Sequence, residues 1–237
     1  MNRREIFAEF YQILERLRIK IGGFKQLADA RGRMGWPTRG VYLFFERGEV
    51  REDGRTPRVV RVGTHAVSRG SQAELWGRLL QHRGPLRGRY PGGGNHRGSQ
   101  FRYLVGDALI RSSDSVAMPA LSQSWGIGNS ASREILRAEH TLEVAVSDRI
   151  RPMPFLYIAI DDPSGPESMR KVVERSTIAL LSNLRREQID PPSKSWLGLN
   201  SYELKVRESG LWNIDHVDED CSPDFLVQLW RCVDALP

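Results

Sequence analysis

Apolar side chains recur at intervals of three and four residues along the first twenty positions of the chain. This spacing places them on one face of a helix, and they are Ile6, Phe7, Phe10, Ile13, Leu14, Leu17 and Ile21. The pattern predicts an amphipathic helix over residues 3–20. Gly22 and Gly23 end it. The segment 24–30 predicts a second, short helix, and the glycine and proline of 32–39 predict a loop.

Two runs rich in β-branched and aromatic residues come next. Residues 41–46 read VYLFFE and residues 58–62 read RVVRV, a composition typical of strands. The polar, glycine-containing residues 47–57 between them predict a hairpin loop. We therefore expect the two strands to pair with each other.

The rest of the pattern alternates helices with one further strand. Residues 71–82 predict a helix, for which Ser71 and Glu74 would form a capping box. The other predicted elements are helices at 132–146, 166–184 and 225–233, a strand at 155–160, an irregular segment at 112–128 and a loop at 190–200. Residues 101–110 again show a periodic pattern of apolar residues. This order predicts one α/β domain of the α+β type, with extra helices outside a small sheet.

Residues 83–102 differ from their surroundings. They read RGPLRGRYPGGGNHRGSQFR, in which eight residues are Gly or Pro, so the segment predicts a loop. Flexible backbone N–H groups and guanidinium groups both bind phosphates. The segment is therefore a candidate nucleic-acid-binding region, with candidate residues Arg83, Arg87, Arg89, Asn95, His96, Arg97 and Arg102.

Composition agrees with a folded protein that binds a polyanion. The 237 residues are 40% hydrophobic and 27% charged, enough for one sizeable core. The net charge is +6 and the pI is about 9.6, which favours nucleic acid as a partner. Neither Cys221 nor Cys232 has neighbours at zinc-ligand spacing, so we expect buried thiols in a reducing compartment.

The charge pattern also bears on location. No apolar run approaches the roughly 18 residues of a membrane span, and the charged N-terminus has no secretory apolar core. We therefore expect a cytoplasmic protein that does not enter a membrane.

Four short sequence motifs follow one another along the chain. They are GVY at 40–42, RVGTH at 61–65, LWGRLLQH at 75–82 and VVERSTIALLSNL at 172–184. This order resembles the GIY-YIG nuclease family. The resemblance implies a three-stranded antiparallel sheet flanked by helices, with a tripeptide on each of the first two strands. It also implies an arginine and a histidine on the next helix and a metal-binding glutamate on a later one.

The resemblance assigns roles to individual residues. Tyr42 ends the first tripeptide and would act as the base. Arg78 and His82 match the helix pair, for phosphate binding and proton transfer. Glu174 matches the metal ligand, with Mg²⁺ or Mn²⁺ as the cofactor. Carboxylates with water are typical Mg²⁺ ligands, arginine forks bind phosphate oxygens, and a tyrosine takes a proton from water once a cation stabilises its phenolate.

The chain also departs from the family pattern. Val62, Gly63 and Thr64 are interpreted as the second tripeptide, so Val62 stands where the tyrosine is expected, and His65 could supply the missing polar group. Ser193 follows a proline-bearing turn, where the family has an asparagine, and is a further candidate nucleic-acid-binding residue. The matched core spans 39–84 and 154–195. It leaves an N-terminal helical extension at 1–38, a basic and helical insert at 85–153 and a C-terminal extension at 196–237, all within one domain of residues 1–237.

Three functions stay open at this point. The first is a metal-dependent endonuclease that hydrolyses phosphodiester bonds in DNA, with double-stranded DNA as the expected partner. The second is a nucleic-acid-binding module of the same fold without activity, and the third is a protein-interaction domain. DNA against RNA, sequence specificity, a restriction, repair or defence role, and the oligomeric state are not fixed, although a dimer would suit cutting of both strands. His140 and Glu143 form an H-x-x-E pair expected on the surface.

Overall fold

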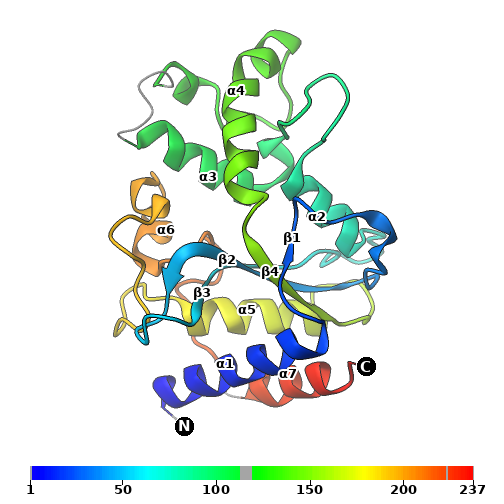
Figure 1. Ribbon diagram of the computed structural model, residues 1–237, viewed down its shortest axis with the longest axis vertical. Helices are drawn as coiled ribbons and strands as arrows, with labels where there is room; N and C mark the ends of the chain where they lie inside the picture. The colour runs from blue at the N-terminus through cyan, green and yellow to red at the C-terminus, as the bar shows by residue number, and fades with distance from the viewer. Residues whose placement is uncertain (1, 113–118, 223, 237) are drawn as a thin grey trace.

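Four antiparallel strands form one open sheet at the centre of the protein (Figure 1). The computed structural model describes residues 2–112, 119–222 and 224–236. The sheet order is β1-β4-β2-β3, with bounds β1 Lys25–Gln26, β2 Gly40–Val50, β3 Pro57–Gly63 and β4 Pro154–Ala159. The three predicted strands and the fold class, a small antiparallel sheet flanked by helices, are confirmed.

The fourth strand, β1, lies where a short helix was predicted, and that prediction is wrong. Gly22 and Gly23 have positive φ values of 70° and 93°, which turn the chain toward the sheet at the end of the first helix. The two residues of β1 then pair with Phe155 and Pro154 of β4. A strand partner satisfies the backbone groups that a helix would have satisfied internally, so tertiary contact overrides the local pattern.

Helices cover both faces of the sheet (Figure 1). Helices α1, α5 and α7 lie on the lower face in this view, and α3 and α4 lie above the sheet. The bounds are α1 Arg3–Lys20, α2 Leu75–Arg83, α3 Gln100–Arg111, α4 Arg133–Ile150, α5 Met169–Leu181, α6 Leu204–Ser209 and α7 Asp224–Asp234. Short 3₁₀ turns are η1 Gly32–Met34, η2 His96–Gly98, η3 Pro119–Gln123 and η4 Leu197–Asn200. The α6 helix was not predicted, and the predicted irregular segment 112–128 lies partly outside the described residues.

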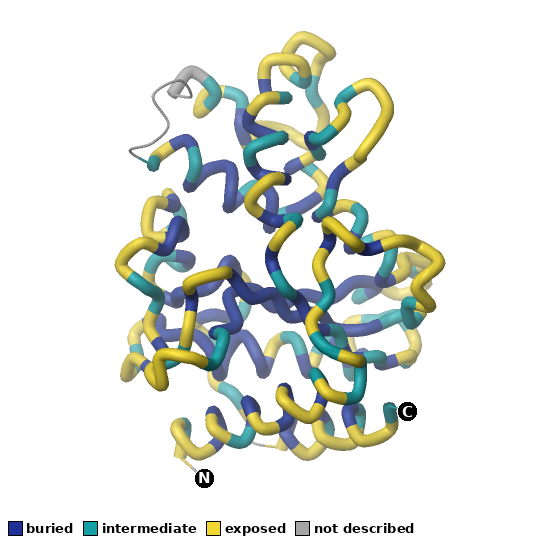
Figure 2. The backbone as a smooth tube through the Cα atoms, in the orientation of Figure 1, coloured by how far each residue is buried: buried dark blue, intermediate teal, exposed yellow. Residues whose placement is uncertain are grey.

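Alternation along β2 gives the molecule two hydrophobic clusters. Val41, Leu43 and Phe45 face α1, α5 and α7, whereas Tyr42 and Phe44 face α2, α3 and α4. Figure 2 shows the result as a dark central sheet enclosed by helices whose outer sides are exposed. Because successive strand residues point to opposite faces, a single strand supplies both clusters.

Helix α2 begins at Leu75, four residues later than predicted. The Leu75 N–H donates to the Thr38 carbonyl at 2.9 Å, which ties the helix to the segment before β2. The predicted capping box is wrong, because the Ser71 hydroxyl accepts from the Ala73 N–H at 3.3 Å and Glu74 makes no side-chain cap. The last turn of α2 lies against the beginning of β2, where His82 contacts Tyr42.

The basic segment is a loop only over part of its predicted length. Residues 84–95 lack regular structure, but η2 follows and α3 begins at Gln100. The predicted apolar period at 101–110 is the buried side of α3. Ser99 caps this helix, since its hydroxyl accepts from the Arg102 N–H at 3.3 Å.

Candidate active site

Tyr42 is fully buried on β2 and lies against a glycine of the neighbouring strand. Tyr42 pairs with Gly63 of β3 in the sheet register. A Cβ atom added to Gly63 would be 2.3 Å from the Tyr42 hydroxyl. The ring also packs edge-on against Phe44, with 5.7 Å between the ring centroids. Only glycine at position 63 therefore leaves room for the phenol.

His82 joins the Tyr42 hydroxyl from the last turn of α2. Its Nε2 lies 2.8 Å from the Tyr42 oxygen, and its Nδ1 lies 2.8 Å from the Ser99 hydroxyl oxygen. The imidazole is completely buried. Burial holds the pKa of His82 well below its usual value, and the charges of Arg78, Arg61 and Arg102 lower it further. The ring is therefore neutral at physiological pH.

Glu174 reaches the end of β3 from α5. Its Oε1 accepts a hydrogen bond from the Thr64 backbone N–H at 2.9 Å, one residue beyond Gly63. Burial raises the pKa of Glu174, while Arg61, His216, the Thr64 N–H and Arg78 oppose that rise. The carboxylate thus lies close to Gly63, which pairs with Tyr42. The charges of Arg61 and Arg78 act on it.

Arg78 lies four residues before His82 on the same side of α2. Its Nη1 donates to Gln81 Oε1 at 2.7 Å and to the Gly98 carbonyl at 3.0 Å. The same guanidinium lowers the pKa of His82 and opposes the raised pKa of Glu174. The structure therefore brings Tyr42, Arg78, His82 and Glu174 into one region, from three elements that are distant in sequence.

The model of the GIY-YIG domain family matches residues 1–237. The chain belongs to the GIY-YIG family. Domains of this family are typically nucleases that act on nucleic acid. No curated protein and no solved structure matches the chain. Within the described residues, no helix is long and apolar enough to cross a membrane.

The strand register favours Arg61-Val62-Gly63 as the second tripeptide, one residue earlier than the interpretation as residues 62–64. Gly63, not Val62, pairs with Tyr42, and Arg61 pairs with Phe44. Val62 packs in the opposite cluster, with α1 and α5. In this interpretation, Arg61 takes the tyrosine position of the motif and lies on the face of the sheet that Tyr42 occupies.

Arg61 is the site residue that sequence reasoning missed. Its side chain is buried, and its Nη1 donates to the Trp212 carbonyl and, at 3.2 Å, to Gln100 Oε1. Its Nε has no partner among the described residues. Burial lowers the pKa of Arg61, and negative charge on Tyr42 or Glu174 opposes this shift. The available signal was an arginine among the β-branched residues of a predicted strand, a signal that Arg58 shares.

His65 lies beyond the tripeptide, as a buried neutral imidazole. Its Nε2 is 3.4 Å from the Thr38 carbonyl, and its Nδ1 has no partner within the described part of the chain. Burial lowers the pKa of His65 to about 4, helped by Arg170, Arg78 and Arg39. The group is uncharged at neutral pH, so it cannot supply a cation to a phosphate there.

One carboxylate is available for a metal at this site. Among residues 2–112, 119–222 and 224–236, no group of three or more His, Cys, Asp or Glu side chains is placed to hold a metal ion. Mg²⁺ keeps several waters and is commonly held by one or two carboxylates together with substrate phosphates. Glu174, half-buried beside Thr64, fits this mode.

Ser193 lies away from Tyr42, at the far end of β2. Its hydroxyl donates to Glu49 Oε1 at 2.5 Å, and its N–H donates to Glu49 Oε2 at 3.1 Å. Glu49 also pairs with Arg58 at 2.7 Å. Tyr42 is near the start of the same strand, so the structure does not bring Ser193 into the catalytic group.

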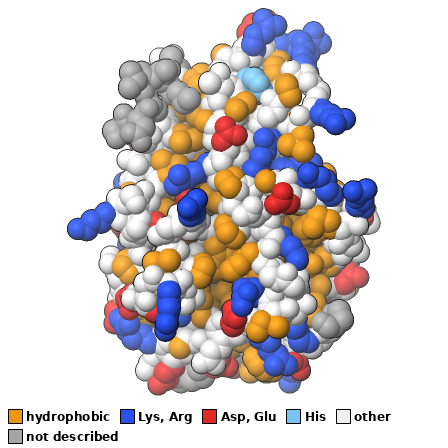
Figure 3. All heavy atoms as spheres, viewed as in Figure 1, with side chains coloured by type: hydrophobic (Ala, Val, Ile, Leu, Met, Phe, Trp, Pro, Cys, Tyr) orange, Lys and Arg blue, Asp and Glu red, His pale blue; other side chains and the backbone are white. Residues whose placement is uncertain are grey.

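The candidate nucleic-acid-binding residues divide into exposed and internal groups. Arg87, Arg89 and Asn95 are exposed on the loop after α2. Figure 3 shows basic side chains gathered along this upper right edge of the molecule. Arg83 is half-buried, donates to the Ala30 carbonyl at 2.9 Å and lies 5.3 Å from the Trp76 ring centroid. The two exposed arginines can meet a phosphate backbone, whereas the Asn95 side chain accepts a hydrogen bond from the Arg97 N–H at 3.0 Å.

The internal group forms a buried ionic cluster beneath the loop. Arg102 donates to Glu143 Oε2 at 2.5 Å, and His96 Nδ1 lies 2.9 Å from Glu143 Oε1. Arg97 pairs with Glu139 at 2.6 Å. The expectation that Glu143 is a surface residue is wrong, because it is buried and hydrogen-bonded to Arg102 and His96. Neither His96 nor Arg102 reaches solvent, so the structure does not present them to DNA.

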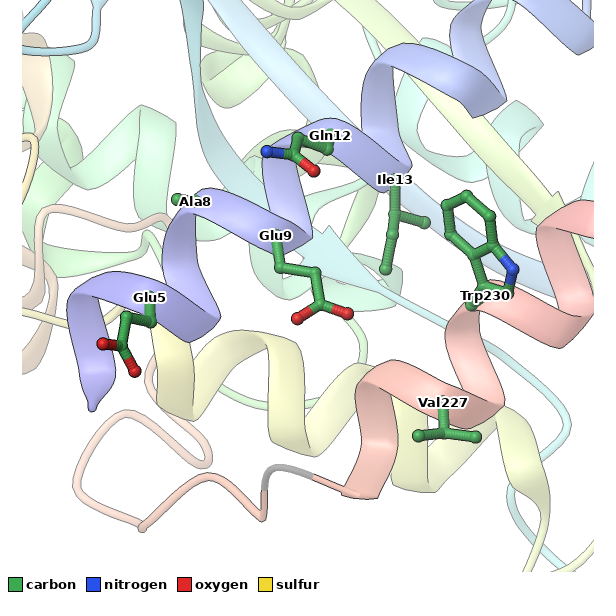
Figure 4. A pocket seen from close by; sticks show the side chains of 7 residues that line it. All are labelled: Glu5, Ala8, Glu9, Gln12, Ile13, Val227 and Trp230. Atoms are coloured by element: carbon green, nitrogen blue, oxygen red, sulfur yellow. The ribbon is translucent and has the colours of Figure 1, made fainter. Parts of the chain in front are cut away.

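A separate hollow lies between α1 and α7, on the side of the sheet away from Tyr42. It has a volume of about 660 Å³ and is lined by Glu5, Ala8, Glu9, Gln12, Ile13, Val227 and Trp230 (Figure 4). None of the candidate catalytic residues lines it. The hollow is therefore separate from the candidate residues at the junction of β2, β3, α2 and α5.

Proposed function

We propose that this GIY-YIG protein is a metal-dependent endonuclease that hydrolyses phosphodiester bonds in double-stranded DNA. The observation that supports it best is the buried Tyr42–His82 pair, which lies against Gly63. Thr64, the next residue after Gly63, binds Glu174. Hydrolysis needs an activated water, neutralisation of charge on phosphorus and a stabilised leaving oxygen. Tyr42 is suited to activating the water, and Arg78 and Glu174 are suited to neutralising the charge on phosphorus.

Tyr42 is the proposed base. A phenolate accepts a proton from the attacking water, and it forms more readily beside positive charge. Arg61, on β3, interacts electrostatically with Tyr42. Arg78 would bind the non-bridging phosphate oxygens through its planar fork.

Glu174 would hold the Mg²⁺ or Mn²⁺ ion, with water and phosphate oxygens as the other ligands. When bound, such an ion supplies Lewis-acid neutralisation of phosphate charge. Glu174 itself is positioned by the Thr64 N–H. The exposed Arg87 and Arg89 would bind the DNA backbone without reading sequence.

The test is cleavage of supercoiled plasmid with Mg²⁺, with Mn²⁺ and with EDTA. We expect metal-dependent nicking or linearisation, which Tyr42→Phe and Glu174→Gln each remove. DNA binding, measured by gel shift, should persist in both variants. Glu134→Gln on the exposed start of α4 is the matched control and should cut normally. Cutting that survives both site substitutions would overturn the assignment.

A second candidate function is supported by two departures from the family pattern. Arg61 stands at the second motif tyrosine, and Ser193 lies outside the catalytic group. Loss of these two groups would be compatible with a DNA-binding module that has no activity. That function predicts intact, salt-sensitive DNA binding with no cutting under any metal condition.

A further inference from the structure

The hollow between α1 and α7 continues into a second hollow along the same two helices. The second has a volume of about 500 Å³, and its lining is Gln12, Glu15, Arg16, Ile19, Lys20 and Trp230. Gln12 and Trp230 line both hollows. Together they form one groove, the α1–α7 groove, which follows α1 from Glu5 to Lys20. Figure 1 shows α1 and α7 as the outermost layer on this side of the sheet.

Apolar side chains in the groove are left in contact with water. The exposed fractions of Ile19, Val227 and Trp230 are 66%, 54% and 41%. Figure 4 shows Val227 and Trp230 on α7 and Ile13 on α1, on the two sides of the first hollow. Exposed aromatic and aliphatic side chains that gather in one groove are typical of a surface that binds another protein.

Charge changes sign along the groove, and its N-terminal end is acidic. Glu5 and Glu9 line this end. The Glu5 carboxylate accepts a hydrogen bond from the Asn2 N–H at 2.8 Å. Within the described part of the chain, neither glutamate forms an ion pair with an arginine, lysine or histidine. The chain therefore leaves two negative charges unpaired here.

The C-terminal end of the groove has a net positive charge. Arg16 and Lys20 line it together with Glu15. Glu15 is paired with Arg18 at 2.6 Å, and Arg16 is paired with Asp234. Lys20 donates to two backbone carbonyls, one of them that of Asp234 at 2.8 Å. Among the described residues no carboxylate pairs with Lys20, so its positive charge remains.

The charged positions are arranged symmetrically about the middle of the groove. Glu9 and Arg16 are equally far from the midpoint of residues 5–20, and so are Glu5 and Lys20. When a second copy lies antiparallel on the first, the acidic end of each copy meets the basic end of the other. We propose that the α1–α7 groove is the contact between two copies of this chain, related by a two-fold axis through that midpoint.

The size of the groove predicts how strongly the copies bind. The 18 residues of α1 extend over roughly 27 Å, and two packed helices present a face roughly 20 Å wide. The contact then buries roughly 500 Å² per copy, near the lower limit for a specific interface. We therefore expect a reversible dimer with a dissociation constant in the micromolar range. Tyr42 lies on the other side of the sheet, so the dimer does not depend on the proposed nuclease function.

The first test is sedimentation velocity of the full chain over a range of concentrations, up to about 1 mM. We expect a shift from the 27.0 kDa monomer to a dimer. Trp230→Ser should weaken the dimer at least about tenfold. Tyr202→Ser is the matched control, because Tyr202 is 67% exposed and lies under Arg111 as Trp230 lies under Arg16. A monomer at every concentration, or equal weakening by both substitutions, would refute the proposal.

The second test exchanges charges across the two-fold axis. Glu9→Arg and Arg16→Glu each place like charges opposite one another at two positions, so each variant alone should dimerise at least about tenfold more weakly. An equal mixture of the two variants brings opposite charges together at both positions and should recover the wild-type dimer. Circular dichroism checks that both variants are folded. A mixture as weak as its components would rule out the two-fold arrangement.

Discussion

Gly63→Ala is the substitution whose effect can be worked out most fully from the structure. The new methyl carbon would lie 2.3 Å from the Tyr42 hydroxyl, whereas ordinary contacts begin near 3.4 Å. The two groups must therefore separate by about 1.1 Å, the difference between these distances. The phenol is fully buried and hydrogen-bonded to His82, so it has little free space to enter.

The expected cost combines two effects. Overpacking a filled core costs about 1–3 kcal/mol, and a lost buried hydrogen bond adds about 1 kcal/mol. We therefore expect Gly63→Ala to lower the free energy of unfolding by about 2–4 kcal/mol. Displacement of the Tyr42 hydroxyl should also remove cleavage in the fraction of protein that stays folded.

Gly77→Ala is the matched control for this change. Gly77 is exposed in the middle of α2, and an added Cβ would have nothing within 4 Å. Removing a helical glycine should raise stability by about 0.5–1 kcal/mol. Urea unfolding followed by circular dichroism measures both variants, with plasmid cleavage beside it. Equal stability and activity for Gly63→Ala and the wild type would refute the contact between Gly63 and Tyr42.

Three other predictions follow from buried and exposed charges. Because burial lowers the pKa of His65 from 6.5 to about 4, its contribution to stability is complete above pH 6.5 and is lost toward pH 4. It should amount to at most about 3 kcal/mol. Urea unfolding across this range should show a shallower pH dependence in His65→Gln, and an unchanged dependence would contradict the assignment. Arg102→Met should cost about 3–5 kcal/mol, because Glu143 is left buried without its main cation. Adding Glu143→Leu should recover most of that loss in the same unfolding assay, and no recovery would argue against the pair. Replacing Arg87 and Arg89 by serine should reduce the slope of log binding constant against log salt by about 2. Fluorescence anisotropy of labelled DNA measures that slope, and a variant that lacks an exposed arginine on α1 is the control. If the control reduces the slope as much as the loop variant does, the loop is not the interface.

Local pattern predicted the elements whose burial is one-sided. The helix at 3–20 was predicted with its observed bounds, because a stripe of apolar residues needs no knowledge of its partner. The strands are buried on both faces and were predicted instead from their β-branched and aromatic composition, although β2 extends to Val50. The helix predicted at 24–30 failed because its alternative, pairing with β4, depends on a strand far away in sequence.

The candidate site divides in the same way. Tyr42, Arg78, His82 and Glu174 could be proposed from motif order, and the structure places them together. Arg61 could not be found without the strand register, because a shift of one residue reverses the face of a side chain. In the basic segment, sequence could not separate an exposed Arg87 from a buried Arg102, because the partner of Arg102 lies 41 positions later.

The margins of the sheet have a consequence for solubility. On the β3 side, the Trp212 N–H donates to the Val60 carbonyl, and the Asn213 amide makes two hydrogen bonds with the Val62 backbone. The opposite margin, β1, is only two residues long and polar. An edge strand with unpaired backbone groups can pair with a strand of another molecule, which leads to aggregation. With one margin occupied by its own chain and the other too short to act as a template, this protein is protected from self-association through its sheet.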